Sequence, residues 1–130
     1  MAQRIILAFD KFKGSLSSEQ VAAAFKQGWQ SVVPDSDIVT VPIADGGDGL
    51  LQSLATALGA STRSVVAHDP LGRSISTHYA TSGDTAIIEM AQVSGVALLE
   101  SEERNPMLTS SYGLGEVMLD ALDRGARHMI

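Results

Sequence analysis

The chain has 130 residues, a usual length for one domain, with 45% apolar and 18% charged residues and no apolar run of transmembrane length. Its formal net charge of -6 opposes polyanions and makes nucleic acid a poor partner, and the lack of cysteine excludes disulfides and thiolate zinc sites. Because the amino terminus also lacks the long apolar stretch of a signal peptide, we expect a cytoplasmic protein with no membrane partner.

The first part of the chain predicts a βαβα pattern. The apolar run at residues 4–9 suits a strand that is covered on both faces of a parallel sheet. Ser17 and Gln20 form a candidate capping box for the helix that follows. The β-branched run at residues 38–43 predicts a second strand, and the next helix is expected to end at Gly59 in the left-handed conformation.

From about residue 61 the pattern changes to short strands joined by tight turns. The runs SVVAH, SISTHYAT and TAIIEM, separated by DPLG and SGD, are typical of antiparallel strands. A last helix is expected from about Tyr112 to Arg124, and the final apolar residues suit the start of another strand. We predict an α/β fold with a Rossmann-like βαβα start over residues 1–60, then a second α/β domain over residues 61–130 that begins with antiparallel strands, in a truncated chain.

The turn DKFKGS lies between the first strand and the first helix. Lys11 and Lys13 flank it, and Gly14 and Ser15 allow backbone N–H groups to meet an anion at the start of the helix. The alternative is that both lysines are solvated and that Ser15 only helps to cap the helix. The residues alone leave both interpretations open.

The turn ADGGDG follows the second predicted strand. It places Asp45 and Asp48 around Gly46 and Gly47 at the carboxyl end of that strand, where open α/β sheets bind ligands. The two carboxylates could hold Mg²⁺ through water, or one could accept a hydroxyl proton. Alternatively, the aspartates only cap the next helix.

Two later features also carry polar groups. Glu89 closes an apolar strand, where a desolvated carboxylate needs a partner such as a strand-end salt bridge. The segment RNPMLTSSYG combines Arg104 with Ser110 and Ser111 just before the last helix. This segment can bind an anion or a carboxylate, or it can form only an elaborate N-cap.

Taken together, the motifs resemble the bacterial glycerate kinase family, which phosphorylates D-glycerate from ATP. The matching stretches are IILAFDKFKGSLSSEQVA, PIADGGDGLL, DPLGR, AIIEMAQVSG, RNPMLTSSYGLGE and DALDRGARHMI, and they cover essentially the whole chain. The resemblance implies a longer, two-domain α/β enzyme that holds its substrate between the domains. The glycine-rich stretch that follows RGARHMI in such proteins is absent here, so we expect an incomplete amino-terminal part that is inactive by itself.

The resemblance also implies the reaction and the residue roles. The enzyme would be a phosphotransferase that moves the ATP γ-phosphoryl group to a glycerate hydroxyl, with Mg²⁺ neutralising phosphate charge. Asp45 would orient or deprotonate that hydroxyl, Lys13 would be the second catalytic residue, and Asp48 would support the metal. The expected contacts with substrate or phosphate are Asp10, Lys11, Gly14, Ser15, Gly46, Gly47, Glu89, Arg104, Ser110 and Ser111.

A rival hypothesis is a flavodoxin-like module that holds a phosphate-bearing ligand without chemistry. An enzyme half should regain ATP-dependent glycerate phosphorylation when it is mixed with the missing carboxyl-terminal portion, whereas a binding module should show ligand affinity alone. The expected partners of the enzyme are glycerate and a nucleotide. Pairing of an open sheet edge with another copy would also allow a homo-oligomer.

Overall fold

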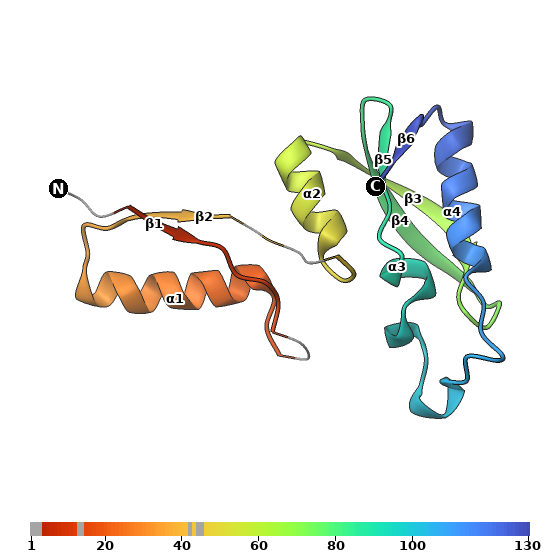
Figure 1. Ribbon diagram of the computed structural model, residues 1–130, viewed down its shortest axis with the longest axis horizontal. Coiled ribbons are helices and arrows are strands. Elements are labelled where there is room, and N and C mark those ends of the chain that lie inside the picture. Colours follow the sequence, from red (N-terminus) through yellow and green to blue (C-terminus); the bar gives the residue numbers. More distant parts are fainter. Residues whose placement is uncertain (1–3, 13–14, 42, 44–45) are drawn as a thin grey trace. The chain divides into compact units, whose positions relative to one another are not determined.

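The computed structural model describes residues 4–12, 15–41, 43 and 46–130 (Figure 1). The chain folds as two compact units, Met1–Gly46 and Gly47–Ile130. Within the described ranges, no helix combines the length and the apolar character that a membrane-crossing segment needs.

The amino-terminal unit is a βαβ arrangement. Strands β1 (Arg4–Leu7) and β2 (Asp37–Thr40) pair in parallel, and helix α1 (Ser18–Val32) connects them. The predicted capping box is present, because Ser17 Oγ accepts the N–H of Gln20 and the Gln20 side chain accepts the N–H of Ser17. The parallel pair and its helical crossover match the first three elements of the predicted βαβα start.

The core of this unit is small. Leu7 and Ala22 are each only 3% exposed, and the rings of Phe25 and Trp29 stack with their centroids 6.0 Å apart. In contrast, Ile6 in the middle of β1 is 64% exposed. The prediction that this strand is covered on both faces is therefore wrong for this unit, because alternate side chains of a strand point to opposite faces and only one of them meets α1.

The carboxyl-terminal unit is built on a four-stranded sheet with the order β3-β4-β5-β6. Strands β3 (Ser61–His68), β4 (Ser74–Ser82) and β5 (Thr85–Ile87) are antiparallel, as predicted. Strand β6 (His128–Met129) pairs in parallel with β5. The last apolar residues of the chain thus enter a strand, as the sequence indicates.

Helices cover both faces of this sheet (Figure 1). Helix α2 (Leu50–Leu58) packs on one face through Leu51, and helix α4 (Tyr112–Asp123) packs on the other. The faces can be told apart on β4, where Tyr79 belongs to the cluster under α4 and its neighbour Ala80 to the cluster under α2. The cluster under α4 consists of Ala67, Tyr79, Ala86, Val93, Val117, Ala121 and Ala126.

Short helical turns connect β5 to α4. They are helix α3 (Ala91–Ser94) and the 3₁₀ helices η1 (Val96–Leu98) and η2 (Ser101–Glu103). Helix α2 ends at Gly59 with φ 58°, the left-handed conformation that the sequence predicts. These elements confirm the α/β class of the fold.

The two compact units divide between Gly46 and Gly47, ahead of the domain boundary expected near residue 60. The physical reason is that α2 buries Leu51 against Ala80 and Ile87 of the second unit's sheet. Helix α2 is thus part of the carboxyl-terminal core. The domain boundary near residue 60 stays a prediction.

A polar contact also joins α4 to the sheet. The hydroxyl of Tyr79 and Nε of Arg124 each donate to Oδ2 of Asp120 at 2.8 Å. The hydrogen bond from Arg124 lowers the pKa of Asp120, with burial opposing it and the Tyr79 hydrogen bond reinforcing it. Burial and the Asp120 carboxylate together raise the pKa of Tyr79. Near neutral pH the phenol therefore remains the donor and the carboxylate the acceptor.

Helix α4 comes very close to β3 at Gly113. A Cβ atom at this position would lie 1.8 Å from the carbonyl oxygen of His68 and 2.9 Å from Cγ2 of Val93. We expect Gly113→Ala to lower the free energy of unfolding by roughly 1–3 kcal/mol, because helix and strand must move apart. Urea denaturation followed by far-ultraviolet circular dichroism measures this loss.

Gly115→Ala is the matched control on the same helix. Its Cβ would meet no atom within 4 Å, so the better helix propensity of alanine should raise stability by up to about 1 kcal/mol. Equal stability of the two variants would contradict the close approach of α4 to β3.

Candidate ligand-binding site

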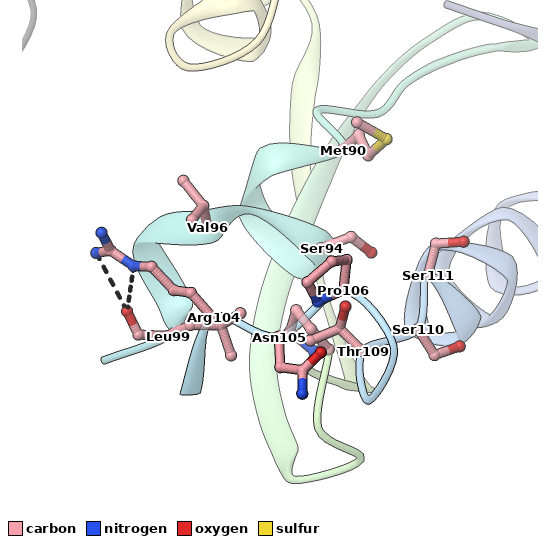
Figure 2. Close-up of a pocket in the computed structure, with 11 residues that line it drawn as sticks. Met90, Ser94, Val96, Leu99, Arg104, Asn105, Pro106, Thr109, Ser110 and Ser111 are labelled. Atoms are coloured by element: carbon pink, nitrogen blue, oxygen red, sulfur yellow. Dashed lines mark hydrogen bonds between the residues drawn. The ribbon is translucent and has the colours of Figure 1, made fainter. Parts of the chain in front are cut away.

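A cavity of about 490 Å³ lies in the carboxyl-terminal unit, between α3 with η1 and the loop that leads to α4 (Figure 2). Its volume is in the range of small-molecule sites. It brings together three predicted site residues, Arg104, Ser110 and Ser111. The full lining is Pro70, Met90, Ser94, Val96, Leu99, Arg104, Asn105, Pro106, Thr109, Ser110 and Ser111.

The apolar part of this lining was not predicted from the sequence. Pro70 comes from the turn between β3 and β4, Met90 precedes α3, and Val96 and Leu99 belong to the η1 region. Pro70 is distant in the sequence from the other three, and none of the four carries a polar signal. Only the packing of three segments around one space identifies them as lining residues.

Arg104 makes two long hydrogen bonds to one backbone carbonyl. Its Nε and Nη2 atoms both donate to the carbonyl oxygen of Leu99 at 3.4 Å, which is long for a hydrogen bond. Figure 2 shows the guanidinium directed to Leu99 and away from Ser110 and Ser111. Contact of Arg104 with a carboxylate or phosphate stays a prediction.

Ser110 and Ser111 lie at the start of α4. The N–H of Ser110 donates to the carbonyl oxygen of Pro70 at 2.9 Å, and its Oγ accepts the N–H of Tyr112 at 3.1 Å. Ser110 therefore accepts one N–H at the start of α4, whereas Ser111 at the N-cap position makes no side-chain cap hydrogen bond. Binding of an anion by the same segment stays a prediction, to which the helix dipole would contribute.

A second contact fixes α4 next to the cavity. Oε2 of Glu116 accepts the backbone N–H of His68 at 2.8 Å, and Oε1 of Glu116 lies 2.9 Å from Nδ1 of the same residue. The side-chain hydrogen bond from His68 lowers the pKa of Glu116, against the opposing effect of burial. The carboxylate thus remains an ionised acceptor that ties α4 to the end of β3.

Glu89 is buried, only 3% exposed, just after the end of β5. Its Oε2 accepts the N–H groups of Gly49 and Leu51, both at 3.0 Å, and its Oε1 accepts Nε2 of Gln92 at 3.1 Å. Among the described residues, the partners of this carboxylate are the amino terminus of α2 and Gln92, with no salt bridge of the expected kind. The sequence feature that could have indicated this contact is Gly49, an N-cap residue with no side chain to accept the N–H groups at the start of α2. Contact of Glu89 with substrate stays a prediction.

The lysine turn belongs to the amino-terminal unit. Lys13 and Gly14 lie outside the described residues. Oδ1 of Asp10 accepts the N–H of Lys11 at 2.7 Å, and Oγ of Ser15 donates to the carbonyl oxygen of Phe12 at 3.3 Å. The contact of this turn with phosphate stays a prediction.

The glycine-rich turn contains Asp45, which lies outside the described residues. Gly46 and Gly47 have φ angles of 97° and 68°, which favour glycine. Nζ of Lys11 donates to the carbonyl oxygen of Gly46 at 3.5 Å, so in the amino-terminal unit Lys11 contacts a residue of this second turn. Among the described residues no three His, Asp or Glu side chains form a metal-binding group, and metal support by Asp48 stays a prediction.

Comparison with known proteins gives one consistent result. The model of the glycerate kinase family matches residues 5–130. The glycerate kinase of Halalkalibacterium halodurans is 42% identical over 128 residues, which are 97% of this chain and 34% of the relative. The glycerate 2-kinase of Escherichia coli K12 is 40% identical over 129 residues, 98% of this chain and 34% of the relative.

A crystal structure agrees with these relatives. It is provisionally assigned as glycerate kinase 2 from Salmonella typhimurium LT2, and it superposes with a TM-score of 0.77 at 38% identity. The match covers 99% of this chain and 35% of that one. The chain therefore spans about a third of the length of the relatives that it matches.

The Glu89 contact predicts a local stability effect. Glu89→Ala leaves the N–H groups of Gly49 and Leu51 without their buried acceptor, and we expect α2 to lose roughly 1–3 kcal/mol of stability. Glu89→Gln keeps one acceptor oxygen and should lose less. Amide hydrogen exchange of α2 measures the effect, with the exposed Glu102→Ala as the control. Unchanged exchange in Glu89→Ala would contradict the capping of α2 by this carboxylate.

Proposed function

This chain belongs to the glycerate kinase family, and we propose that it supplies the amino-terminal part of an enzyme that transfers the γ-phosphoryl group of ATP to D-glycerate. The product is a phosphoglycerate, and the partners are the small acid and the nucleotide. The identity of about 40% to relatives named glycerate kinase supports the proposal. We place the reaction in the cytoplasm, in keeping with the lack of cysteine.

The cavity in front of α4 is the main structural support for the substrate assignment. Glycerate is a small carboxylic acid with two hydroxyls, so its site needs a cation or helix start for the carboxylate and hydrogen-bonding groups for the hydroxyls. Arg104, Asn105, Thr109, Ser110 and Ser111 provide these groups in a cavity whose other lining residues are apolar except for Ser94. A guanidinium binds a carboxylate through two parallel N–H bonds.

The transfer step is assigned to the two turns of the first half of the chain. Asp45 orients or deprotonates the attacking hydroxyl, while Lys11 and Lys13 steady the phosphate groups. Mg²⁺ is usually held by one or two carboxylates together with substrate phosphates, so the exposed Asp48 has the right ligand chemistry. When bound, the metal neutralises charge on the transferring phosphate.

Arg104→Ala tests the substrate assignment. The protein used is a chimera in which this chain replaces the matching first third of the Halalkalibacterium halodurans glycerate kinase. We expect the chimera to phosphorylate D-glycerate with ATP and the chain alone to be inactive. In Arg104→Ala the KM for D-glycerate should rise roughly tenfold, the cost of one weakened charge-assisted contact, with the KM for ATP unchanged.

Arg63→Ala is the control, because Arg63 is an exposed arginine of β3 outside this cavity. An unchanged KM for D-glycerate in Arg104→Ala would contradict the substrate site. A chimera that binds ATP or glycerate but never transfers phosphate would favour the rival hypothesis of a binding module.

Asp45→Asn tests the assignment of the base. Amide and carboxylate have nearly the same shape, so the change removes the proton acceptor and little else. We expect kcat of the chimera to fall by roughly 10²–10⁴, the usual contribution of a general base. Coupled-enzyme kinetics at saturating glycerate and ATP measure the loss, with Asp48→Asn compared at several Mg²⁺ concentrations. Unchanged turnover would remove Asp45 from the mechanism.

A further inference from the structure

The turn between β3 and β4 is organised by a buried carboxylate. Asp69 is only 4% exposed, and its Oδ1 accepts the N–H groups of Leu71 at 2.9 Å and Arg73 at 2.8 Å. Its Oδ2 accepts Nε of Arg73 at 2.5 Å. Both carboxylate oxygens are therefore used inside the turn, and one of them holds the guanidinium of Arg73 in place.

The charge of Asp69 is stabilised at neutral pH. Burial by itself raises the pKa of this carboxyl, but the hydrogen bonds from Arg73 and Leu71 outweigh burial and leave the pKa below its usual value. The hydrogen bond to Asp69 likewise raises the pKa of Arg73. The ion pair thus persists over the physiological pH range, and the direction of the guanidinium is fixed by the turn.

The other two nitrogens of this guanidinium reach the wall of the cavity. Nη1 of Arg73 donates to Oε1 of Glu103 at 2.8 Å, and Nη2 donates to the carbonyl oxygen of Leu98 at 3.0 Å. Leu98 and Glu103 each directly precede a residue that lines the cavity, Leu99 and Arg104. One side chain therefore holds the beginning of the segment that forms this wall.

The same turn holds the end of that segment. The carbonyl oxygen of Pro70, next to Asp69, accepts the N–H of Ser110 at 2.9 Å. The chain between Leu98 and Ser110 is thus fastened to the β3–β4 turn at both ends. Long connecting segments are usually mobile. A ligand site on such a segment therefore needs attachments like these two to keep its geometry defined.

We propose that Arg73 is a positioning residue of the substrate site, which holds the Leu98–Ser110 segment so that Arg104 and Ser110 can meet the carboxylate of glycerate. This inference rests on the proposed function. Arg73 itself does not line the cavity, so it acts through Glu103 and the backbone of Leu98. The planar guanidinium is essential, because three partners in different directions suit its rigid fork and do not suit a lysine ammonium.

Arg73→Lys tests whether the site needs the shape of the guanidinium or only its positive charge, because lysine can still neutralise the buried Asp69. In the full chain we expect amide hydrogen exchange of residues 98–110 to increase at least about tenfold, since the segment loses one of its two attachments. Exchange in β4 and α1 should not change. Arg63→Lys, at an exposed position of β3, is the matched control.

Kinetics of the chimera give the second readout. We expect Arg73→Lys to raise the KM for D-glycerate roughly tenfold, with kcat and the KM for ATP within about twofold of the parent, since a shift of the binding wall affects one substrate. Glu103→Gln should have a similar effect, and the double variant should be no worse than the single variants if both act through one contact.

The outcomes distinguish this inference from the proposed function. An inactive parent chimera would overturn the proposed function, and amide exchange of the chain would then decide the positioning of the segment by itself. Unchanged exchange in Arg73→Lys would overturn the positioning role. Faster exchange with an unchanged KM for D-glycerate in an active chimera would overturn it as well.

Discussion

The approach of α4 to the end of β3 determines where the candidate site lies. Gly113 allows the helix backbone to reach the carbonyl oxygen of His68, and Glu116 one turn later accepts the N–H of the same residue. A larger residue at Gly113 would lift the start of the helix from the sheet. Ser110 and Ser111, which precede α4, would then leave the cavity that they line together with α3 and η1.

Buried carboxylates organise the loops around this contact. Asp69 and Glu89 are 4% and 3% exposed, and each accepts backbone N–H groups that would otherwise lack a partner. A buried charge is costly unless hydrogen bonds compensate it, so each carboxylate makes one arrangement of its loop much more stable than the alternatives. Asp69 directs Arg73 to the cavity wall, and Glu89 holds the start of α2.

The elements with strong local signals were predictable. The capping box of Ser17 and Gln20, the left-handed Gly59 and the antiparallel strands of the second half are all present, because each depends on residues close together in the sequence or on a period of two. The burial of the first strand was not predictable in the same way. Its apolar run indicates a strand, but which of its faces is covered depends on elements that lie elsewhere in the chain, and Ile6 remains 64% exposed.

The sequence by itself determined the α/β class, the order of the elements and the polar segment of Arg104, Ser110 and Ser111, because hydrophobic period, caps and turn residues act over a few neighbouring positions. Only the tertiary structure decided that this segment faces Met90 and Val96 across one cavity. The tertiary structure also decided that Glu89 accepts hydrogen bonds from the start of α2, and that Arg73 reaches Glu103. These contacts join residues about 30 to 40 positions apart, and such pairs are selected by the packing of sheet and helices, which no local pattern records.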